Sequence, residues 1–468
     1  MNLLYERFQS VARSNGTTIA LAKGDSVTTF AELLDLAGVL APRLAAAEVG
    51  PGRPLVLAAP NGPEVAASVV AAWSLGSLPV FVSPHAPAGH LELAVRQSHA
   101  AARLTETEGL APCDPRERHP ELGPEIGSVV FTSGSTGRPK GVMQTQESLI
   151  GGAERIGRLN GYEATDRILC PVPWSHDYGW GQLLTCLLLG IGLVLPAVDG
   201  VQGLSDAIER HRPSILAGTP SVFAGMVYGI SNIRTADLTS LRKVTSTGSN
   251  LSPELVDELL VLLPGAAVYS NYGLTETYRS CCLTPEFRKG RERSVGRPVE
   301  GVEILIVGPD NQPLPPGEVG QVVHRGAGGF AAYLGDADRT AASRYDTQAV
   351  LTGDMGWLDV EGFLYLKGRR DRMIKSMDVL VGLDEVEHIL IGSRLLRQIG
   401  VIARPHKVIG MKIEAHVVLK DAEEAAALKA FARQNLSKYQ MPREFFFVDA
   451  LPMTASGKID YLTLSRDH

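Results

Sequence analysis

The chain has 468 residues, too many for one ordinary domain, and its 44% apolar content is enough to form complete hydrophobic cores. Its formal net charge of −6 gives no general basic field, which argues against nucleic acid as a partner. The cysteines show no C-x-x-C spacing and indicate a reducing compartment; they are Cys113, Cys170, Cys186, Cys281 and Cys282.

The sequence shows neither a secretory signal nor a membrane span. The first ten residues, MNLLYERFQS, carry charges where a signal peptide would have an apolar run. The longest apolar run, residues 183–195, is interrupted by Thr185, Cys186 and two glycines and is too short to cross a bilayer. We therefore expect a cytoplasmic protein without membrane contact.

Helix-like and strand-like segments alternate through the first two thirds of the chain. The pattern predicts helices over residues 30–47, 64–75, 182–189, 204–210, 221–228 and 253–263. It predicts strands over residues 55–59, 79–83, 129–131, 168–171, 193–195, 214–217, 243–246 and 267–270. Residues 86–124 are polar and proline-rich, and we expect surface structure there. This alternation with short connections predicts an α/β fold in which helices flank parallel sheets.

The pattern changes in the last third of the chain. Residues 294–366 are rich in strands and glycine–proline turns, which indicates a β subdomain. A small mobile α+β domain should begin at Gly368, so the expected division is 1–367 and 368–468. Its predicted elements are helices over 384–391 and 421–434 and strands over 398–403, 413–419 and 444–448.

The most informative segment is VVFTSGSTGRPKGV, residues 129–142. Its glycines allow successive backbone N–H groups to point into one concavity and bind an anion, and Lys140 supplies a compact positive charge. Two residues separate Gly137 from Lys140, which excludes the Walker spacing G-x-x-x-x-G-K-[ST]. By composition alone, the segment would also fit a surface turn.

The run TSGSTGRPKGV resembles the phosphate loop of the adenylate-forming superfamily, which contains acyl- and aryl-CoA synthetases, luciferases and amino-acid adenylation domains. Further motifs of that superfamily follow in order, so the resemblance covers nearly the whole chain. It implies that ATP is bound by Thr132, Ser133, Gly134, Ser135, Thr136, Gly137 and Lys140.

The segment SNYGLTET, residues 270–277, is similar to the superfamily's second motif. The resemblance implies that Asn271, Tyr272 and Gly273 contribute to the ATP site, with the tyrosine on the adenine. It also implies that Thr275 meets the α-phosphate and that Glu276 binds Mg²⁺, since a carboxylate beside phosphates requires a cation between them. Without the first motif, these residues would fit a helix cap equally well.

Two further segments resemble the ribose and hinge motifs. In LTGDMGWLD, residues 351–359, the resemblance implies that Asp354 binds the ribose hydroxyls, although an isolated T-G-D would fit a simple turn. In KGRRDRMIKSMD, residues 367–378, it implies that Arg369 contacts the ribose and that Asp371 is the hinge.

The same segment carries Lys375, which the resemblance assigns to the surface used in thioester formation. Family members usually have glycine where Asp378 stands and a basic residue where Leu380 stands. These departures concern the second half-reaction and not adenylation. Near the C-terminus, MTASGKID resembles the segment with the catalytic lysine, here Lys458, which would stabilise the negative charge gathered in the transition state.

The segment PWSHDYGWGQ, residues 173–182, resembles the lining of the acid pocket, and Gly248 and Ser249 are also expected there. Amino-acid-activating members often have an aromatic–Asp pair that binds the substrate ammonium, and here the pair is His176–Asp177. Trp180 should narrow the pocket. Two alternatives remain for Asp177: it caps the following helix, or it pairs with His176. In either case the substrate would be a neutral aryl or short acyl acid.

We therefore expect an AMP-forming acid–thiol ligase that uses ATP and Mg²⁺. In the preferred reading, the enzyme activates a small amino acid or β-amino acid and transfers it to the phosphopantetheine thiol of a carrier protein. The alternative is an acyl- or aryl-CoA synthetase that acts on a non-amino acid with CoA as acceptor. The motif residues argue against a non-catalytic binding relative, and the sequence does not determine the oligomeric state.

Overall fold

The computed structural model describes residues 2–466 apart from 115–116, 134–138, 199, 230–231, 250, 377–378, 407–409 and 454–458. The chain divides into two compact units, Met1–Ile304 with His324–Val350 and Leu305–Val323 with Leu351–His468. Both units are discontinuous in sequence. The expected domain boundary at residue 368 lies inside the second unit and stays a prediction.

Two sheets form the first unit, as far as its described residues show. In the smaller sheet the order is β18 (Ala332–Tyr333), β8 (Pro139–Thr145), β7 (Ile126–Ser133), β4 (Pro79–Phe81), β3 (Leu55–Ala58), β5 (Ala102–Thr105) and β6 (Gly109–Pro112). In the larger sheet it is β15 (Arg297–Pro298), β14 (Cys281–Leu283), β13 (Ala267–Tyr272), β12 (Lys243–Ser246), β11 (Ile215–Gly218), β9 (Arg167–Leu169), β10 (Gly192–Leu195), β1 (Ile19–Lys23) and β2 (Ser26–Thr29).

A layer of helices lies between these two sheets. Alternate strand residues belong to different cores: Leu57 and Leu193 share one core, whereas Val56 and Val194 face away from it. The shared core contains α1 (Leu3–Ser14), α2 (Phe30–Ala46), α3 (Pro63–Ser74), α5 (Gln146–Leu159) and α6 (Asp177–Leu189). Helices α3 and α6 are buried on nearly every face, as their continuous apolar sequences require.

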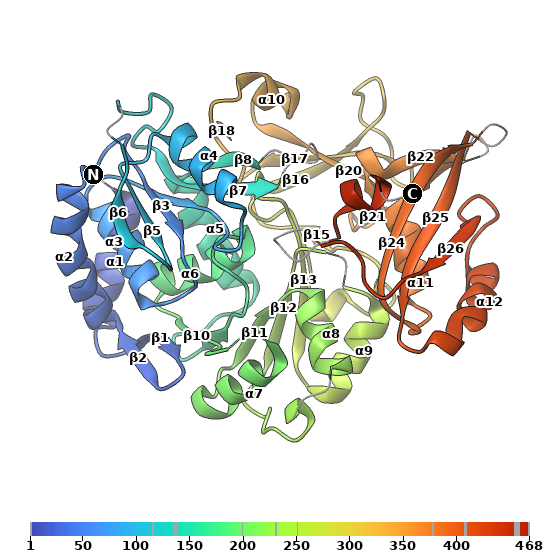
Figure 1. Ribbon diagram of the computed structural model, residues 1–468, viewed down its shortest axis with the longest axis horizontal. Helices are drawn as coiled ribbons and strands as arrows, with labels where there is room; N and C mark the ends of the chain where they lie inside the picture. Colours follow the sequence, from blue (N-terminus) through green and yellow to red (C-terminus); the bar gives the residue numbers. More distant parts are fainter. Residues whose placement is uncertain are drawn as a thin grey trace. The chain divides into compact units, whose positions relative to one another are not determined.

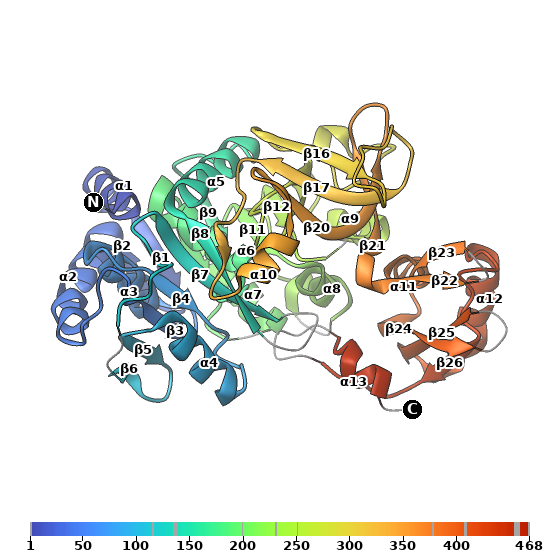
Figure 2. The same ribbon diagram turned by 90° about the horizontal axis from the view of Figure 1, so that it is seen from above.

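Other helices cover the outer faces of the two sheets. The larger sheet carries α7 (Gly200–His211), α8 (Pro220–Tyr228) and α9 (Pro253–Leu262), which lie together beside β11–β13 in Figure 1. The smaller sheet carries α4 (Ala88–Ser98). The short helix α10 (Ala337–Ala342) follows β18. The order in this unit is therefore helix, sheet, helix, sheet, helix, and Figure 2 gives a second view of it.

The parallel part of the larger sheet sets the position of the candidate site. Strand β12 pairs in parallel with β11 on one side and β13 on the other, and Ser246 is opposite Ser270. The segments that follow these strands therefore lie at one carboxyl edge, where open α/β sheets bind ligands.

The second unit contains the small α+β domain. Its sheet has the order β23 (Val379–Gly382), β22 (Met373–Ser376), β25 (Gly410–Leu419) and β24 (Leu396–His406), with β26 (Glu444–Phe447) beside β25. Helices α11 (Leu383–Ile391), α12 (Ala425–Asn435) and α13 (Tyr461–Arg466) accompany it. A further sheet, β16 (Val302–Val307), β17 (Gly320–Gly326), β20 (Ala349–Leu358), β19 (Arg344–Asp346) and β21 (Leu364–Arg369), contains the points where the chain passes between the units.

The predicted α/β class is confirmed, but two local predictions are wrong. Residues 86–124 are not only surface structure, because they contain α4 and β5, and β5 pairs with the central strand β3. Helix α6 begins at Asp177 instead of residue 182, and Gly179 permits this because a Cβ there would lie 2.2 Å from the Pro173 carbonyl oxygen. Among the described helices, none combines the length and the apolar character needed to cross a bilayer.

Candidate active site

The predicted phosphate loop joins two antiparallel strands of the smaller sheet. Thr132 on β7 is opposite Lys140 on β8, and Ser133 is opposite Pro139. The Thr132 hydroxyl oxygen is buried and has no hydrogen-bond partner among the described residues, so it remains available to a ligand. Gly134, Ser135, Thr136 and Gly137 lie outside the described residues.

Lys140, Glu276 and Tyr333 form a compact cluster in the first unit. The Lys140 ammonium donates to Glu276 Oε1 at 2.6 Å and to the Tyr333 hydroxyl at 3.1 Å. The Tyr333 hydroxyl donates to the same Glu276 oxygen at 2.7 Å, and the ammonium lies 4.6 Å from the centre of the tyrosine ring. Burial alone would raise the pKa of Glu276, but Lys140 and Tyr333 hold it below its usual value. The carboxylate is therefore kept ionised.

This cluster fits the predicted magnesium site. Glu276 is only 7% exposed and carries a stable negative charge. No group of three metal-ligating side chains occurs in the part of the chain that the structure describes. Magnesium commonly takes one or two protein carboxylates and completes its shell with phosphate oxygens and water. A single ionised glutamate beside Lys140 of the predicted phosphate loop has the donor chemistry that this binding mode requires.

The rest of the second motif lies at the carboxyl edge of the larger sheet. The Asn271 amide donates to the Ser246 carbonyl at 3.3 Å, and the Thr247 hydroxyl donates to the Asn271 carbonyl at 3.0 Å. Asn271 Oδ1 is buried without a partner in the described chain, so one acceptor remains at this edge. Tyr272 ends β13 and is 8% exposed, while Gly248 and Ser249 are exposed just after β12. Gly273, Gly248 and Ser249 are thus brought to the edge where a nucleotide is expected.

Asp177 is the first residue of α6, and the preceding His176 is the N-cap. Helix capping by Asp177, one of the alternatives left open by the sequence, is therefore wrong. Its carboxylate accepts a hydrogen bond from the Gln144 amide at 2.7 Å, and the same amide donates to the Thr275 carbonyl at 3.3 Å. Gln144 thus connects the predicted acid pocket to the nucleotide motif.

Arg279 is a site residue that the sequence reasoning missed. It is 4% exposed, and its guanidinium lies over the rings of Tyr178 and Tyr278 at 5.0 and 5.7 Å. Burial raises the pKa of Asp177 to about 7, while the Arg279 charge and the Gln144 hydrogen bond oppose that rise. The Arg279 charge thus offsets only part of the effect of burial on Asp177.

Trp180 does not have the role that the sequence predicted. Its side chain is fully buried in the core, with ring centres 4.7 Å from Phe81 and 6.0 Å from Trp73. These two partners belong to β4 and α3, so the ring packs into the helix layer between the two sheets. The prediction that Trp180 directly narrows the acid pocket is wrong, because the first turn of α6 turns this face of the helix towards the core.

In the second unit, the pairing of β20 with β21 brings the two predicted ribose ligands together. Asp354 is opposite Arg369, and the Arg369 guanidinium donates to Asp354 Oδ1 at 3.2 Å and to the Thr352 carbonyl at 3.1 Å. Gly353 has φ +76°, and a Cβ there would lie 3.1 Å from the Arg369 guanidinium. The glycine therefore permits the turn and the close approach of this pair.

The predicted hinge residue, Asp371, lies in a short 3₁₀ helix, Arg370–Arg372, and its side chain is 52% exposed. Asp384 binds the chain on both sides of it. One carboxylate oxygen accepts the Arg369 backbone N–H at 2.8 Å, and the other accepts the Arg372 guanidinium. The hydrogen bonds on both sides of the predicted hinge residue are thus accepted by one carboxylate, that of Asp384.

A second glutamate cluster connects this segment to the C-terminal helix. Glu387 accepts hydrogen bonds from the Arg372 guanidinium and the Val401 N–H, both at 2.7 Å. The Tyr461 hydroxyl lies 2.9 Å from each Glu387 oxygen, and the Arg372 guanidinium stacks 3.7 Å from the centre of the tyrosine ring. Burial raises the pKa of Glu387 to about 7, against the effect of Arg372.

Several predicted residues of the second unit fall outside this description. Lys375 and Leu380 are opposite each other in the β22–β23 pair, but only their backbone is described. Asp378 and Lys458 lie outside the described residues. Their predicted roles in thioester formation and adenylation remain predictions.

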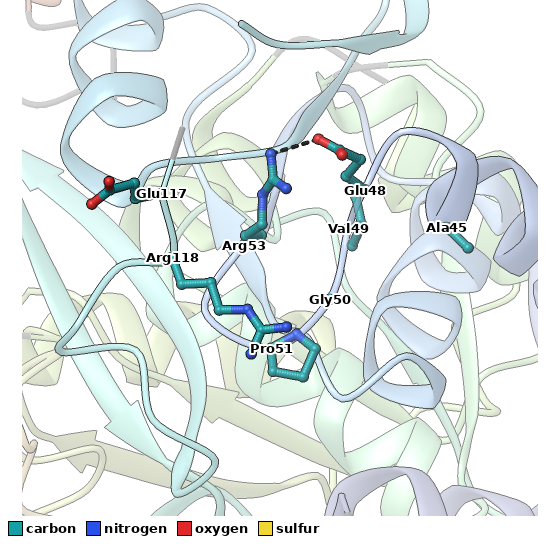
Figure 3. A pocket seen from close by; sticks show the side chains of 8 residues that line it. All are labelled: Ala45, Glu48, Val49, Gly50, Pro51, Arg53, Glu117 and Arg118. Atoms are coloured by element: carbon teal, nitrogen blue, oxygen red, sulfur yellow. Dashed lines mark hydrogen bonds and ion pairs between the residues drawn. The ribbon is translucent and has the colours of Figure 1, made fainter. Parts of the chain in front are cut away.

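A surface hollow of about 470 Å³ lies away from these residues in the sequence (Figure 3). It is lined by the end of α2, by residues just after this helix and by residues 117–118, and Arg53 pairs with Glu48 at 2.7 Å on its wall. None of its lining residues belongs to a predicted motif. We assign it no part in the reaction.

Comparison with known proteins gives matches over almost the whole chain. The family model described as AMP-binding enzyme matches residues 8–128 and 116–334, and that of the AMP-binding enzyme C-terminal domain matches residues 385–458. The 2-succinylbenzoate–CoA ligase of Bacillus subtilis is 28% identical over 461 residues, covering 94% of this chain and 93% of that protein. The indoleacetate–CoA ligase of Aromatoleum aromaticum is 32% identical over 348 residues, covering 73% and 67%.

Solved structures agree with these matches. The o-succinylbenzoate CoA synthetase of Bacillus subtilis in complex with its acyl-adenylate intermediate aligns with a TM-score of 0.87 at 26% identity, covering 99% of this chain and 98% of that chain. The same synthetase with ATP and a magnesium ion aligns with a TM-score of 0.85 at 27% identity, covering 97% and 98%. The fold class and the use of ATP and magnesium are thereby confirmed. The roles of individual residues stay predictions.

Proposed function

Because the chain belongs to the AMP-binding enzyme family and is an AMP-forming acid–thiol ligase, we propose that it converts a small carboxylic acid without an amino group to its CoA thioester. This function is the alternative that the sequence left open, an acyl- or aryl-CoA synthetase that acts on a non-amino acid. The relatives described above are named CoA ligases and support CoA as the acceptor. They give no support to the preferred reading, transfer to a carrier protein.

The choice of substrate rests on the residues that surround the Asp177 carboxylate. The amino-acid reading assumed that a buried carboxylate needs a cation and that the substrate ammonium provides it. Here the Gln144 amide binds Asp177 at 2.7 Å, and the charge of Arg279 already acts on it. Burial nevertheless raises the pKa of Asp177 to about 7, so near neutral pH the carboxyl is partly protonated and is held by Gln144 without a cation from the substrate.

The residues of the first unit would act in the adenylation step. Bound Mg·ATP supplies the phosphoanhydride bond that breaks when the acid attacks, giving an acyl-adenylate and pyrophosphate, and the CoA thiol then displaces AMP. Lys140 and Tyr333 keep Glu276 ionised and fixed in orientation, which preorganises the negative charge for the cation. Thr132 and Asn271 have buried oxygens available for hydrogen bonds with the nucleotide.

A substrate screen tests the proposal directly. Pyrophosphate release should be faster with aryl and short aliphatic acids than with amino acids of the same carbon skeleton. Thioester formation from the best acid should be faster with CoA than with a phosphopantetheinylated carrier protein. A preference for amino acids, or for the carrier protein, would contradict the proposal.

The Asp177→Asn variant separates the two substrate readings. Because asparagine keeps the shape and a carbonyl acceptor for Gln144, we expect kcat/KM to change alike for an amino acid and its des-amino analogue. Asp35→Asn, on the exposed face of α2, is the matched control. A selective loss on the order of 2–4 kcal/mol for the amino acid would instead show that Asp177 binds an ammonium group.

A further inference from the structure

The ring of Tyr278 is inserted between helices α5 and α6, which pack side by side (Figure 1). The residue is 3% exposed. A Cβ built on Gly152 of α5 would lie 2.5 Å from Tyr278 Cε1, and one built on Gly181 of α6 would lie 3.1 Å from its hydroxyl oxygen. Both helices therefore carry a glycine where the tyrosine enters.

The backbone at Tyr278 is unusual for a large side chain. Its φ is 51°, in the left-handed region that glycine adopts easily and that bulky residues rarely adopt. The turn would be relaxed with glycine at this position. The chain nevertheless places an aromatic ring there, and the ring fills the space between the two helices.

Tyr278 lies next to the candidate active site in the sequence, and it packs against the helix that begins at Asp177. Tyr278 follows Glu276 by two residues, in the segment between β13 and β14. Asp177 begins α6, and Gln144 connects Asp177 to the Thr275 carbonyl. The first turn of α6 and the space that Tyr278 fills between α5 and α6 are thus close to Glu276 along the chain and through the bonds of Gln144.

That space is closed in this structure. Tyr278 occupies it, and the Arg279 guanidinium lies against the rings of Tyr278 and Tyr178 behind it. The Tyr178 hydroxyl is itself bound to the Thr245 carbonyl at 2.7 Å, which fixes this wall to β12. A long acyl chain would meet an aromatic ring and a buried cation instead of an open apolar corridor.

We propose that Tyr278 is a specificity-determining residue that ends the acid-binding pocket and restricts the enzyme to short aliphatic and single-ring aromatic acids. The inference rests on the proposed function, because it assumes that an acid is activated beside Glu276. It adds a limit on the length of that acid and identifies the side chain that sets it.

The test uses Tyr278→Gly, because glycine suits the left-handed backbone and removes the whole ring. Pyrophosphate release is measured for wild type and variant with straight-chain acids of increasing length and with benzoate, phenylacetate and longer phenylalkanoates. The decisive acid is the shortest one that the wild-type enzyme does not activate. For this acid, kcat/KM should rise about tenfold or more in the variant, because one methylene group in an apolar pocket changes kcat/KM by about this factor. Tyr278→Phe is the matched control and should keep the wild-type length limit.

The melting temperature of both proteins is recorded with the same acids in the absence of ATP, because this reports binding without catalysis. Longer acids should stabilise Tyr278→Gly more than wild type. If no acid releases pyrophosphate but this difference in binding is present, the proposed function fails and the pocket limit stands. If Tyr278→Gly does not fold, Tyr278→Leu should show a smaller shift in the same direction. Identical length profiles in wild type and folded variant would overturn the proposal.

Discussion

The two units each contain a glutamate, buried in one and half-buried in the other, that is bound by a cation and by a tyrosine hydroxyl. In the first unit Glu276 meets Lys140 and Tyr333, and in the second unit Glu387 meets Arg372 and Tyr461. Although each glutamate has a cation and a tyrosine hydroxyl as partners, the two pKa shifts are opposite. The pKa of Glu276 lies below its usual value, whereas the pKa of Glu387 is raised to about 7.

The neighbouring charges explain this difference. Burial favours the protonated form of both glutamates, but Glu276 faces a lysine that has no other carboxylate partner in the described chain. Arg372 is shared between Glu387 and Asp384, and the negative charge of Asp384 raises the pKa of Glu387 further. A glutamate with its own cation stays an anion and can hold a metal ion, while one that shares its cation titrates near neutral pH.

The largest effect is expected for Glu276→Gln, which keeps the size of the side chain and removes its charge. We expect adenylation to fall about 10²–10³-fold, the range measured for the loss of one preorganised electrostatic group, and half-maximal activity to need more Mg²⁺. ATP–pyrophosphate exchange at varied magnesium concentration measures both. The exposed Glu300, paired with Arg158 at 2.8 Å, gives the control variant Glu300→Gln. An unchanged rate and magnesium dependence in Glu276→Gln would exclude the metal-binding role.

A smaller effect, specific to pH, is expected for Glu387→Gln. Because the pKa of Glu387 rises from 4.5 in the unfolded chain to about 7 in the fold, the folded state holds an additional proton between these values. Its contribution to stability is complete below pH 4.5 and is lost as pH rises through about 7. The total is about 3 kcal/mol. The glutamine variant should lose this part of the pH dependence, as measured by melting temperatures from pH 5 to 8.

The first unit provides the comparison for that measurement. Asp177 also has a raised pKa, so it contributes a slope of the same sign that Asp177→Asn should remove. Glu276 has a lowered pKa, so its contribution is present above its usual pKa and is lost as pH falls. If Glu387→Gln and wild type keep parallel pH profiles, Glu387 does not titrate in this range.

The smallest effect is expected for Tyr461→Phe. The variant loses the hydroxyl that lies 2.9 Å from both Glu387 oxygens but keeps the ring under Arg372. We expect a loss of about 1 kcal/mol in the free energy of unfolding, the usual net value of such a hydrogen bond. Urea denaturation measures it, with Leu462→Ala on the exposed side of α13 as the control. A loss as large as that of Tyr461→Ala would place the stabilisation in the hydroxyl alone, with no contribution from the ring.

The arrangement of elements was largely predictable, because hydrophobic periodicity is a local property of the sequence. The strand expected over residues 243–246 is β12, and the helix expected over 253–263 is α9 within one residue. Residues 102–105 were missed as a strand, because this segment is short and contains Arg103. That side chain is satisfied by Glu92 and Glu108 at 3.0 and 2.9 Å, which a linear pattern does not reveal.

The partners of the site residues were not predictable, because they come from distant parts of the chain. Lys140 and Glu276 are 136 residues apart, and Tyr333 is 57 residues from Glu276 on a strand of two residues. The cation beside Asp177 was sought in the substrate because nothing in the sequence connects Arg279 to that position. Motif spacing predicts which residues belong to the site, while the fold brings in the partners that shift the pKa values of Glu276 and Asp177.

The two-residue strand that carries Tyr333 also has a consequence for the order in which the protein is made. Because the first unit resumes at His324, a ribosome must synthesise residues 305–323 of the other unit before β18 can join β8. Until then, the nascent chain has Lys140 and Glu276 but lacks the tyrosine hydroxyl that bonds to both. Co-translational folding, in which N-terminal regions fold first, thus leaves the charged pair incomplete until the emerging polypeptide extends beyond residue 333.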